Sequence, residues 1–298
     1  MDYVVDEFET LYDRDLSEEE LAAVREKFDQ MYVTRDVYRI YNWFLEENGW
    51  EQLPDVPYES RMLSYEDVFP MLYLKYRLKG KNEHRNIKHL VIDEMQDYSY
   101  LQYVILHTLF SCRMTILGDK AQTLDETMRD VLLFLPKIFG KKMRTIVLNK
   151  SYRNTVEIAT YAGAINQTTD LELLDRHGKA VEEVYFSEEE SMLKAIGENL
   201  SVGENGYETA AVIAMTEEKA RELYELLKRR GIQASYIDRD TSVFERGLTV
   251  TTFYLAKGLE FDQVFGVFEE EENPLMTQAK YICATRALHE LYMYTVSL

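Results

Sequence analysis

Cysteine is scarce in this chain of 298 residues, which contains only Cys112 and Cys283. The two lie far apart and form no metal-ligand spacing, so we predict no disulfide framework and expect a reducing compartment. Long apolar runs are also lacking, because no segment approaches the roughly 18 uninterrupted apolar residues of a membrane span. Residues 1–7 have no basic region ahead of an apolar core, unlike a secretory signal. These absences predict a soluble protein of the cytoplasm.

Positive charge is the second shortage. The chain has 34 Lys and Arg against 53 Asp and Glu, which gives a net charge of −19. Broad electrostatic capture of nucleic acid depends on Lys and Arg that neutralise phosphates, so this balance argues against it. Nucleic acid would therefore have to bind through a local basic groove or through basic parts outside this sequence. An acidic surface also suits docking on a basic partner, although such surfaces are common for solubility alone.

The hydrophobic pattern of the chain changes near residue 87. Residues 1–86 carry apolar side chains at helical spacing, with a capping signal at 15–20, and their aromatic stripes are interpreted as core. After this segment, short apolar runs alternate with helical patterns, which predicts the α/β class, with parallel sheets covered by helices. The stretch 185–207 is expected to be a helix flanked by surface loops. The runs are 89–92, 114–117, 145–148, 210–214, 235–237, 248–253, 264–268 and 291–296, and the helices lie near 99–110, 154–167, 217–230 and 275–288.

An acidic tract follows the first of these runs: His89–Ile92 leads directly into Asp93 and Glu94. A buried strand that ends in adjacent carboxylates presents them at the carboxyl edge of a parallel sheet, where ligands bind. Asp93 would hold Mg²⁺ there, and Glu94 would deprotonate a water for attack on phosphorus. A lone Asp-Glu pair is more often a solvated turn, so this interpretation depends on the tracts that follow.

Four further tracts follow in order. The second run ends in a turn that begins with Gly118 and contains Gln122, whose amide would meet a phosphate or its attacking water. Arg153 begins a helix, residues 251–262 form a mixed apolar and charged tract, and Arg286 lies in the last tract. Each is ordinary alone, as turn chemistry or as a helix-end salt bridge. Two arginines after two strand-end tracts suit neutralisation of charge on a transferring phosphoryl group.

Together the five tracts resemble the signature motifs of superfamily 1 helicases of the UvrD/Rep type. The matching segments are VIDEMQD for Walker B, LGDKAQT for the glutamine motif, SYRN for the first arginine motif, and AKGLEFD and ATRA for the last two. Within that superfamily the HelD (helicase IV) branch is most similar, on YLKYR, DEMQDYS, LNKSYRNTVEI and ATRALHEL. The resemblance covers 87–298 and implies RecA-like parallel sheets flanked by helices, the P-loop NTPase helicase type. Residues 1–86 would be a helical segment, 87–148 the remainder of a first RecA-like domain, and 149–298 the second.

The resemblance also implies an ATP hydrolase that uses Mg²⁺ and moves on single-stranded DNA. Asp93 would bind the metal and Glu94 would be the catalytic base, while Gln122 would sense the γ-phosphate. Arg153 and Arg286 would be arginine fingers, each worth about 10³–10⁵ in rate.

Four residues of the fourth tract complete the implied site. Glu260 would lie near the ribose or the triphosphate, with Gly258 in the same ATP-binding tract. Thr252 and Tyr254 are candidates for contact with nucleic acid.

The sequence departs from the family pattern in three places. It contains no G-x-x-x-x-G-K-S/T, so it lacks the Walker A loop and resembles the C-terminal portion of a longer helicase, inactive by itself. Only residues 155–256 separate SYRN from KGLEFD, where UvrD carries a large extra subdomain, so this protein is expected to have none or a much reduced one. Aromatic residues that would stack bases are missing after Gln122, and Tyr254 stands where a His is usual. Strong translocation along a single strand is therefore in doubt.

Two functions follow from this pattern. The first is the motor portion of a helicase or translocase, which couples ATP hydrolysis to movement on nucleic acid or to release of RNA polymerase, the partner of HelD-type proteins. The alternative is a non-catalytic, helicase-like module that docks on RNA polymerase. The intact acids, glutamine and arginines favour the first, because a scaffold has no chemical need of them. A free-standing metal phosphatase site on Asp93 and Asp97 is disfavoured by the missing nucleophile.

Overall fold

A computed structural model describes residues 2–30, 33–79, 84, 86–124, 130–140, 143–167, 172–203, 206–241, 246–271 and 273–297. The chain forms two compact units, of which the first is Met1–Leu90 with Tyr100–Arg113 and the second is Val91–Ser99 with Met114–Leu298. The second unit therefore contains all five of the tracts. The domain boundaries expected near residues 86 and 148 remain predictions.

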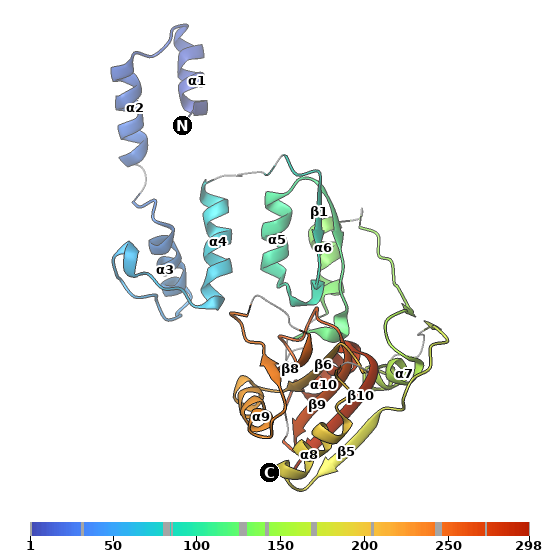
Figure 1. The fold of residues 1–298 in the computed structure, drawn as a ribbon. Helices are drawn as coiled ribbons and strands as arrows, with labels where there is room; N and C mark the ends of the chain where they lie inside the picture. Colours follow the sequence, from blue (N-terminus) through green and yellow to red (C-terminus); the bar gives the residue numbers. More distant parts are fainter. Residues whose placement is uncertain are drawn as a thin grey trace. The chain divides into compact units, whose positions relative to one another are not determined.

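The first unit is helical, as the sequence predicts. Its capping signal takes the expected form: the Ser17 hydroxyl accepts the N–H of Glu20 at 3.3 Å, and the Glu20 carboxylate accepts the N–H of Ser17 at 3.0 Å. Asp36 caps another helix, accepting from the N–H of Tyr38 at 3.0 Å, and is held by Arg61 at 2.7 Å. The helices are α1 Asp2–Tyr12, α2 Glu18–Gln30, α3 Val37–Glu47, α4 Tyr65–Lys79 and α5 Tyr100–Leu109, with a short 3₁₀ turn at Tyr58–Ser60 (Figure 1).

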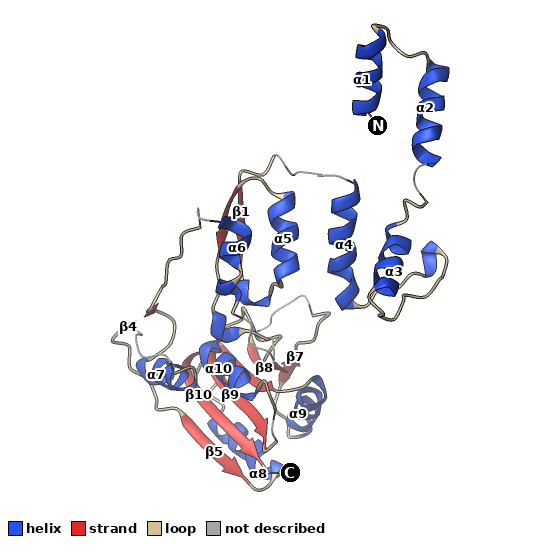
Figure 2. Ribbon diagram, turned by 180° about the vertical axis from the view of Figure 1, so that it is seen from behind, coloured by secondary structure: helices blue, strands red, loops and turns tan. Residues whose placement is uncertain are grey.

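The second unit is built on a six-stranded parallel sheet in the order β5-β10-β9-β6-β8-β7 (Figure 2). This topology confirms the α/β class with a parallel sheet flanked by helices. The strands are β5 Glu182–Phe186, β6 Thr209–Ala214, β7 Ala234–Tyr236, β8 Gly247–Thr252, β9 Phe261–Glu269 and β10 Ala287–Val296. The helices are α7 Val156–Ile165, α8 Glu189–Asn199, α9 Glu217–Arg229 and α10 Met276–Arg286.

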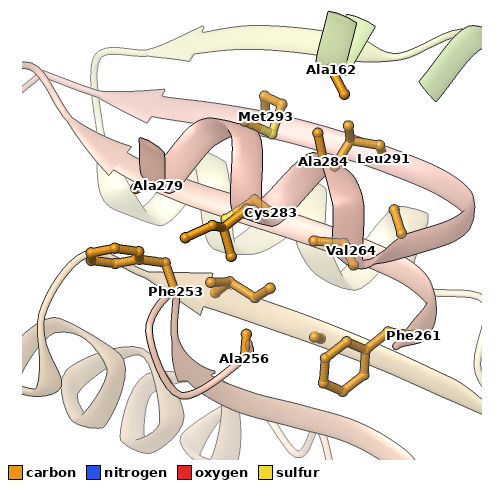
Figure 3. Close-up of a cluster of buried hydrophobic side chains, with 14 of the residues drawn as sticks. Ala162, Phe253, Ala256, Phe261, Val264, Ala279, Cys283, Ala284, Leu291 and Met293 are labelled. Carbon is orange, nitrogen blue, oxygen red and sulfur yellow. The ribbon is translucent and has the colours of Figure 1, made fainter. Parts of the chain in front are cut away.

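The sheet separates two apolar cores, and β6 shows why its sequence is uninterruptedly apolar. Ala211 and Ile213 pack in one core with α7 and α10. Figure 3 shows Ala162 of α7 and Cys283 of α10 in this core. The alternate residues Ala210 and Val212 pack in the other core with α8 and α9. Because both faces of the strand are covered, Ala210 to Ala214 are all buried, and their side chains are all apolar.

Two predictions about strands are wrong. Residues 145–148 form no strand, and Ile146, Val147 and Leu148 are 68%, 80% and 86% exposed. Branched side chains favour a strand only where a neighbouring strand offers packing, and this segment has none among the described residues. Conversely, β5 was missed because its Glu-rich start hides the apolar alternation of an edge strand, in which Val184 packs and Tyr185 is exposed.

The remaining elements are short. The predicted runs at 89–92 and 114–117 become β1 His89–Ile92 and β2 Arg113–Ile116, which form a two-stranded sheet. A second small sheet joins β3 Lys150–Ser151 to β4 Glu172–Leu173, and α6 spans Leu135–Phe139. Among the residues that the structure describes, no helix combines the length and apolar character needed to cross a membrane.

Candidate functional site

The acidic tract begins where β1 ends at the buried Ile92. Asp93 is exposed, and its carboxylate accepts the N–H of Glu94 at 2.8 Å. Glu94 adopts the left-handed conformation, with φ 52° and ψ 48°, which is uncommon outside glycine and recurs at functional sites. The N–H of Leu117 donates to Ile92 O, and the N–H of Met95 donates to Leu117 O, both at 2.8 Å. The acidic tract therefore lies directly beside the glutamine tract.

Buried Gln96 joins these two tracts through its side chain. Its Nε2 donates to Glu94 Oε2 at 2.6 Å, and its Oε1 accepts the N–H of Asp119 at 3.1 Å. Gly118 is required at this point, since a Cβ there would lie 2.5 Å from Gln96 Oε1 and 2.6 Å from the backbone nitrogen of Met95. The close approach of the two tracts thus depends on glycine.

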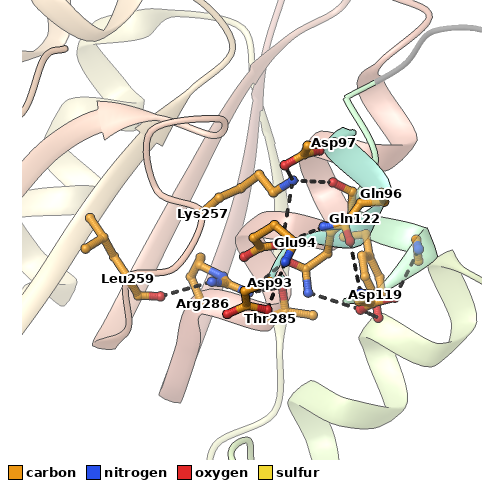
Figure 4. Close-up of polar contacts among 12 residues, drawn as sticks. Asp93, Glu94, Gln96, Asp97, Asp119, Gln122, Lys257, Leu259, Thr285 and Arg286 are labelled. Carbon is orange, nitrogen blue, oxygen red and sulfur yellow. Dashed lines mark hydrogen bonds and ion pairs between the residues drawn. The ribbon is translucent and has the colours of Figure 1, made fainter. Parts of the chain in front are cut away.

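Asp119 fixes the orientation of the Gln122 amide (Figure 4). Gln122 Nε2 donates to Asp119 Oδ2 at 3.0 Å, which leaves Gln122 Oε1 to accept from Arg286 Nη2, also at 3.0 Å. The hydroxyl of Tyr281 donates to the same Asp119 oxygen at 2.8 Å. Hydrogen bonds consequently connect the second tract to the last, more than 160 residues away in the sequence.

Arg286 ends α10 and is only 2% exposed. Its Nη1 donates to Leu259 O at 3.2 Å, but its buried Nε has no hydrogen-bond partner. Burial lowers the pKa of Arg286, nearby Arg153 lowers it further, and Glu94 and Glu260 act in the opposite direction. A buried guanidinium with a free N–H is costly unless something compensates it, so this group suits an anionic ligand.

Arg153 lies at the edge of the same cluster. Its Nη2 pairs with Glu260 Oε1 at 2.6 Å, and the two side chains are 44% and 42% exposed. An ion pair this exposed contributes little to stability, so both groups can exchange it for a ligand. Gly258, two residues before Glu260, has a φ of +80°, a backbone conformation that favours glycine, and it forms the turn that precedes Glu260.

Lys257 is a site residue that the sequence did not reveal. Its ammonium donates to Asp97 Oδ2 at 2.6 Å and to Gln122 O at 2.8 Å, and it lies 4.0 Å from Glu94 Oε2. The side chain is 7% exposed. Its place in the AKGLEFD segment was a signal, but nothing local indicates a contact with Asp97, 160 residues away.

The other missed residues share one property. Gln96, Asp119 and Tyr281 hydrogen-bond to the predicted residues, and the motif comparison assigned no role to them, although Gln96 and Asp119 lie within the matched segments. Glu94, Gln122 and Arg286, by contrast, were predicted from the sequence and lie in one cluster.

The metal and nucleic-acid predictions have less geometric support. Among the described residues, no three His, Cys, Asp or Glu side chains gather as a metal site, so Asp93 would need water and phosphate oxygens as further ligands. Thr252 is fully buried, and its hydroxyl accepts the N–H of Leu255 at 3.4 Å. The hydroxyl of Tyr254 donates to Glu217 Oε1 at 2.9 Å. Contact of Thr252 and Tyr254 with nucleic acid stays a prediction.

Comparison with protein families gives one match. Residues 4–124 match the UvrD/REP helicase N-terminal domain, so that part of the chain is similar to UvrD/REP helicases. The match covers less than half of the 298 residues. It includes the helical segment, in which the motif comparison had used only the short YLKYR match. No curated protein matches the chain.

Solved helicase structures show limited similarity. The C-terminal domain of a possible DNA helicase from Lactobacillus plantarum WCFS1 is 25% identical, covers 49% of this chain and 88% of its own, and has a TM-score of 0.37. An arterivirus nonstructural protein 10 (helicase) in complex with DNA is 16% identical, with a TM-score of 0.41, and this chain spans 72% of itself and 40% of that protein. The PRRSV helicase gives 17% identity, 70% and 35% coverage, and a TM-score of 0.40. The fold class therefore rests on the sheet topology of this chain.

Proposed function

We propose that this chain is the motor portion of an ATP-dependent helicase or translocase of superfamily 1, with ATP and Mg²⁺ as cofactors and single-stranded DNA as its track. The observation that carries the proposal is the 3.0 Å hydrogen bond from Arg286 Nη2 to Gln122 Oε1. It places a buried guanidinium, with its Nε unpartnered, in electrostatic range of Glu94. An acid, an amide and a guanidinium in one cluster are the groups that phosphoryl transfer needs.

Each residue has a role in this proposal that suits its surroundings. MgATP, when bound, would supply the phosphoryl group and the metal. The exposed Asp93 carboxylate suits a metal that keeps most of its water. Glu94, one oxygen of which accepts from Gln96, would take the proton of an attacking water with the other.

The cationic groups would act on the charge of the triphosphate. Arg286 and Arg153 would neutralise it, and Gln122 would exchange its bond to Arg286 for one to phosphate. Glu260 and Gly258 would line the nucleotide beside Arg153. Membership of the HelD branch, and release of RNA polymerase as the mechanical output, belong to the same proposal.

A second candidate is the non-catalytic module that docks on RNA polymerase. Two observations favour it: the sequence holds no Walker A loop, and the Lys257 ammonium already neutralises Asp97 beside Glu94. An acidic cluster with its own counter-charge has less need of a bound metal. The net charge of −19 also suits a basic protein surface better than DNA.

Phosphate release and nucleotide binding distinguish the two functions. We expect the 298-residue chain to bind MgATP weakly, to lose this binding in Arg286→Ala, and to release negligible phosphate. Joined to a segment with a Walker A loop, it should hydrolyse ATP, and Glu94→Gln should abolish this turnover. Full turnover by the chain alone would overturn the assigned roles. Absence of both binding and turnover in the joined protein would favour the docking module.

A further inference from the structure

Residues 175–178, here called the strap, cross the beginning of α7. The carbonyl oxygen of Arg176 accepts the N–H of Val156 at 2.9 Å, and the N–H of Gly178 donates to Glu157 Oε2 at 2.8 Å. His177 Nδ1 lies 2.8 Å from Glu157 Oε1. The strap is thus fastened to the first turn of the helix that follows Arg153.

Two side chains then tie the main chain around Arg153 to the residues that follow Arg286. Arg176 Nη1 donates to the carbonyl oxygen of Arg153 at 2.9 Å, and its Nη2 lies 2.9 Å from Nδ1 of His289. Asn154 Nδ2 donates to the carbonyl oxygen of Ala287 at 2.6 Å. The backbone directly after the Arg153 side chain is therefore attached at two points to the start of β10.

The ties hold in place a side chain that is repelled by a neighbouring group of like charge. Arg153 and Arg286 carry like charges, and the proximity of Arg153 lowers the pKa of Arg286. The carboxylate of Glu260, which pairs with Arg153 and acts on Arg286 in the opposite direction, offsets part of this repulsion. The ties to the main chain hold the backbone that carries Arg153 against the remainder. Gly178 shows how tightly the strap fits, because a Cβ there would lie 2.6 Å from Thr155 Cγ2 and 3.2 Å from His289 O.

We propose that Asn154 and Arg176 are positioning residues that hold Arg153 at a fixed distance from Arg286, so that the two guanidinium groups bind one polyphosphate together. This proposal rests on the proposed function, since it assumes that both arginines contact the triphosphate. Asn154 and Arg176 themselves act through the backbone of Arg153 and through Ala287 and His289. Their effect on binding should therefore depend on the presence of the Arg153 side chain.

Calorimetric titration of the 298-residue chain with inorganic tripolyphosphate tests this dependence. We expect Asn154→Ala and Arg176→Lys each to weaken binding about tenfold, close to the effect of Arg153→Ala. Each substitution would disturb the charge-assisted contact between Arg153 and the polyphosphate. Arg176→Lys keeps the charge and removes the paired donors, so simple loss of positive charge is not what it measures. In an Arg153→Ala background the same two substitutions should cause no further loss, whereas a merely structural effect would add.

A pair of glycine variants tests the same role without changing the side chains of Asn154 and Arg176. Gly178→Ala should weaken binding by displacing the strap, and Gly197→Ala, whose Cβ would meet only Ile232 Cδ1 at 3.4 Å, should not. If Arg153→Ala weakens binding while Asn154→Ala, Arg176→Lys and Gly178→Ala leave it unchanged, the positioning role is wrong and the proposed function stands. If the wild-type chain does not bind, or Arg153→Ala and Arg286→Ala have no effect, both proposals fall.

Discussion

Tyr281 contacts the candidate site through its hydroxyl, which donates to Asp119 Oδ2 at 2.8 Å. Burial, and then Asp119, raises the pKa of Tyr281, so the phenol stays protonated and remains a donor. We expect Tyr281→Phe to cost about 0.5–1.5 kcal/mol in the free energy of unfolding, because Asp119 keeps its bonds to Ala121 N and Gln122 Nε2. Urea denaturation measures this cost.

The same substitution should weaken MgATP binding several-fold, because the Gln122 amide loses part of its orientation. Tyr185→Phe is the matched control, since Tyr185 is 73% exposed. Equal stability and equal affinity for Tyr281→Phe and wild type would show that the hydroxyl does not position the site.

The residues proposed to contact a ligand were easier to identify from the sequence than the residues that hydrogen-bond to them. Glu94, Gln122 and Arg286 follow apolar runs or lie in a matched motif, and the order of the tracts indicated a common site. Lys257 and Gln96 were missed because their partners are a distant carboxylate and a buried backbone N–H. The local sequence pattern predicts neither kind of contact, because both depend on how tracts far apart in the chain pack together.

At the scale of elements, the strap provides a pH-dependent attachment between His177 and Glu157. The hydrogen bond to Glu157 raises the pKa of His177 above 6.5, and the same bond lowers the pKa of Glu157 from 4.5 to about 2. The histidine contribution to stability is complete below pH 6.5 and is lost as the pH rises through the raised pKa. The glutamate contribution is present above pH 4.5 and is lost as the pH falls toward 2.

His177→Ala should therefore lower the Tm near pH 6 and have little effect near pH 9, where the imidazole is neutral in both states. Thermal denaturation of wild type and variant across this range measures the difference. Glu157→Gln serves as the control, because it should reduce the pH dependence of the His177→Ala effect to the smaller part that comes from Asp175, whose Oδ1 lies 3.1 Å from His177 Nε2. A difference in Tm that persists at pH 9 would mean that the imidazole acts by packing and not by charge.

For the fold, too, features set by local sequence were predicted, and features set by distant neighbours were not. Strands β6 and β9 were predicted because burial on both faces produces continuous apolar runs. The edge strand β5 was missed, and residues 145–148 were wrongly assigned, because an edge position depends on which neighbour the sheet supplies. Branched residues such as Val147 satisfy the local preference for a strand whether or not such a neighbour exists.

At the scale of the whole molecule, the excess of 53 acids over 34 bases limits how nucleic acid can bind. Many of the bases are also paired with acids, as in Lys219 with Glu189 at 2.7 Å and Lys179 with Glu182 at 2.9 Å. Binding to single-stranded DNA should then involve few phosphates. A slope of about −2 in log affinity against log salt is expected, since each phosphate contact contributes about −0.7 for a single strand.

Fluorescence anisotropy of a labelled oligothymidylate over a series of NaCl concentrations measures this slope. Glu260→Gln is an informative variant, because it frees Arg153 from its carboxylate without adding a base. Its slope should match that of the wild type if Arg153 serves the triphosphate, and should steepen if Arg153 faces DNA. A wild-type slope of about −5 or steeper would contradict the expectation, since it requires a basic groove with roughly seven phosphate contacts.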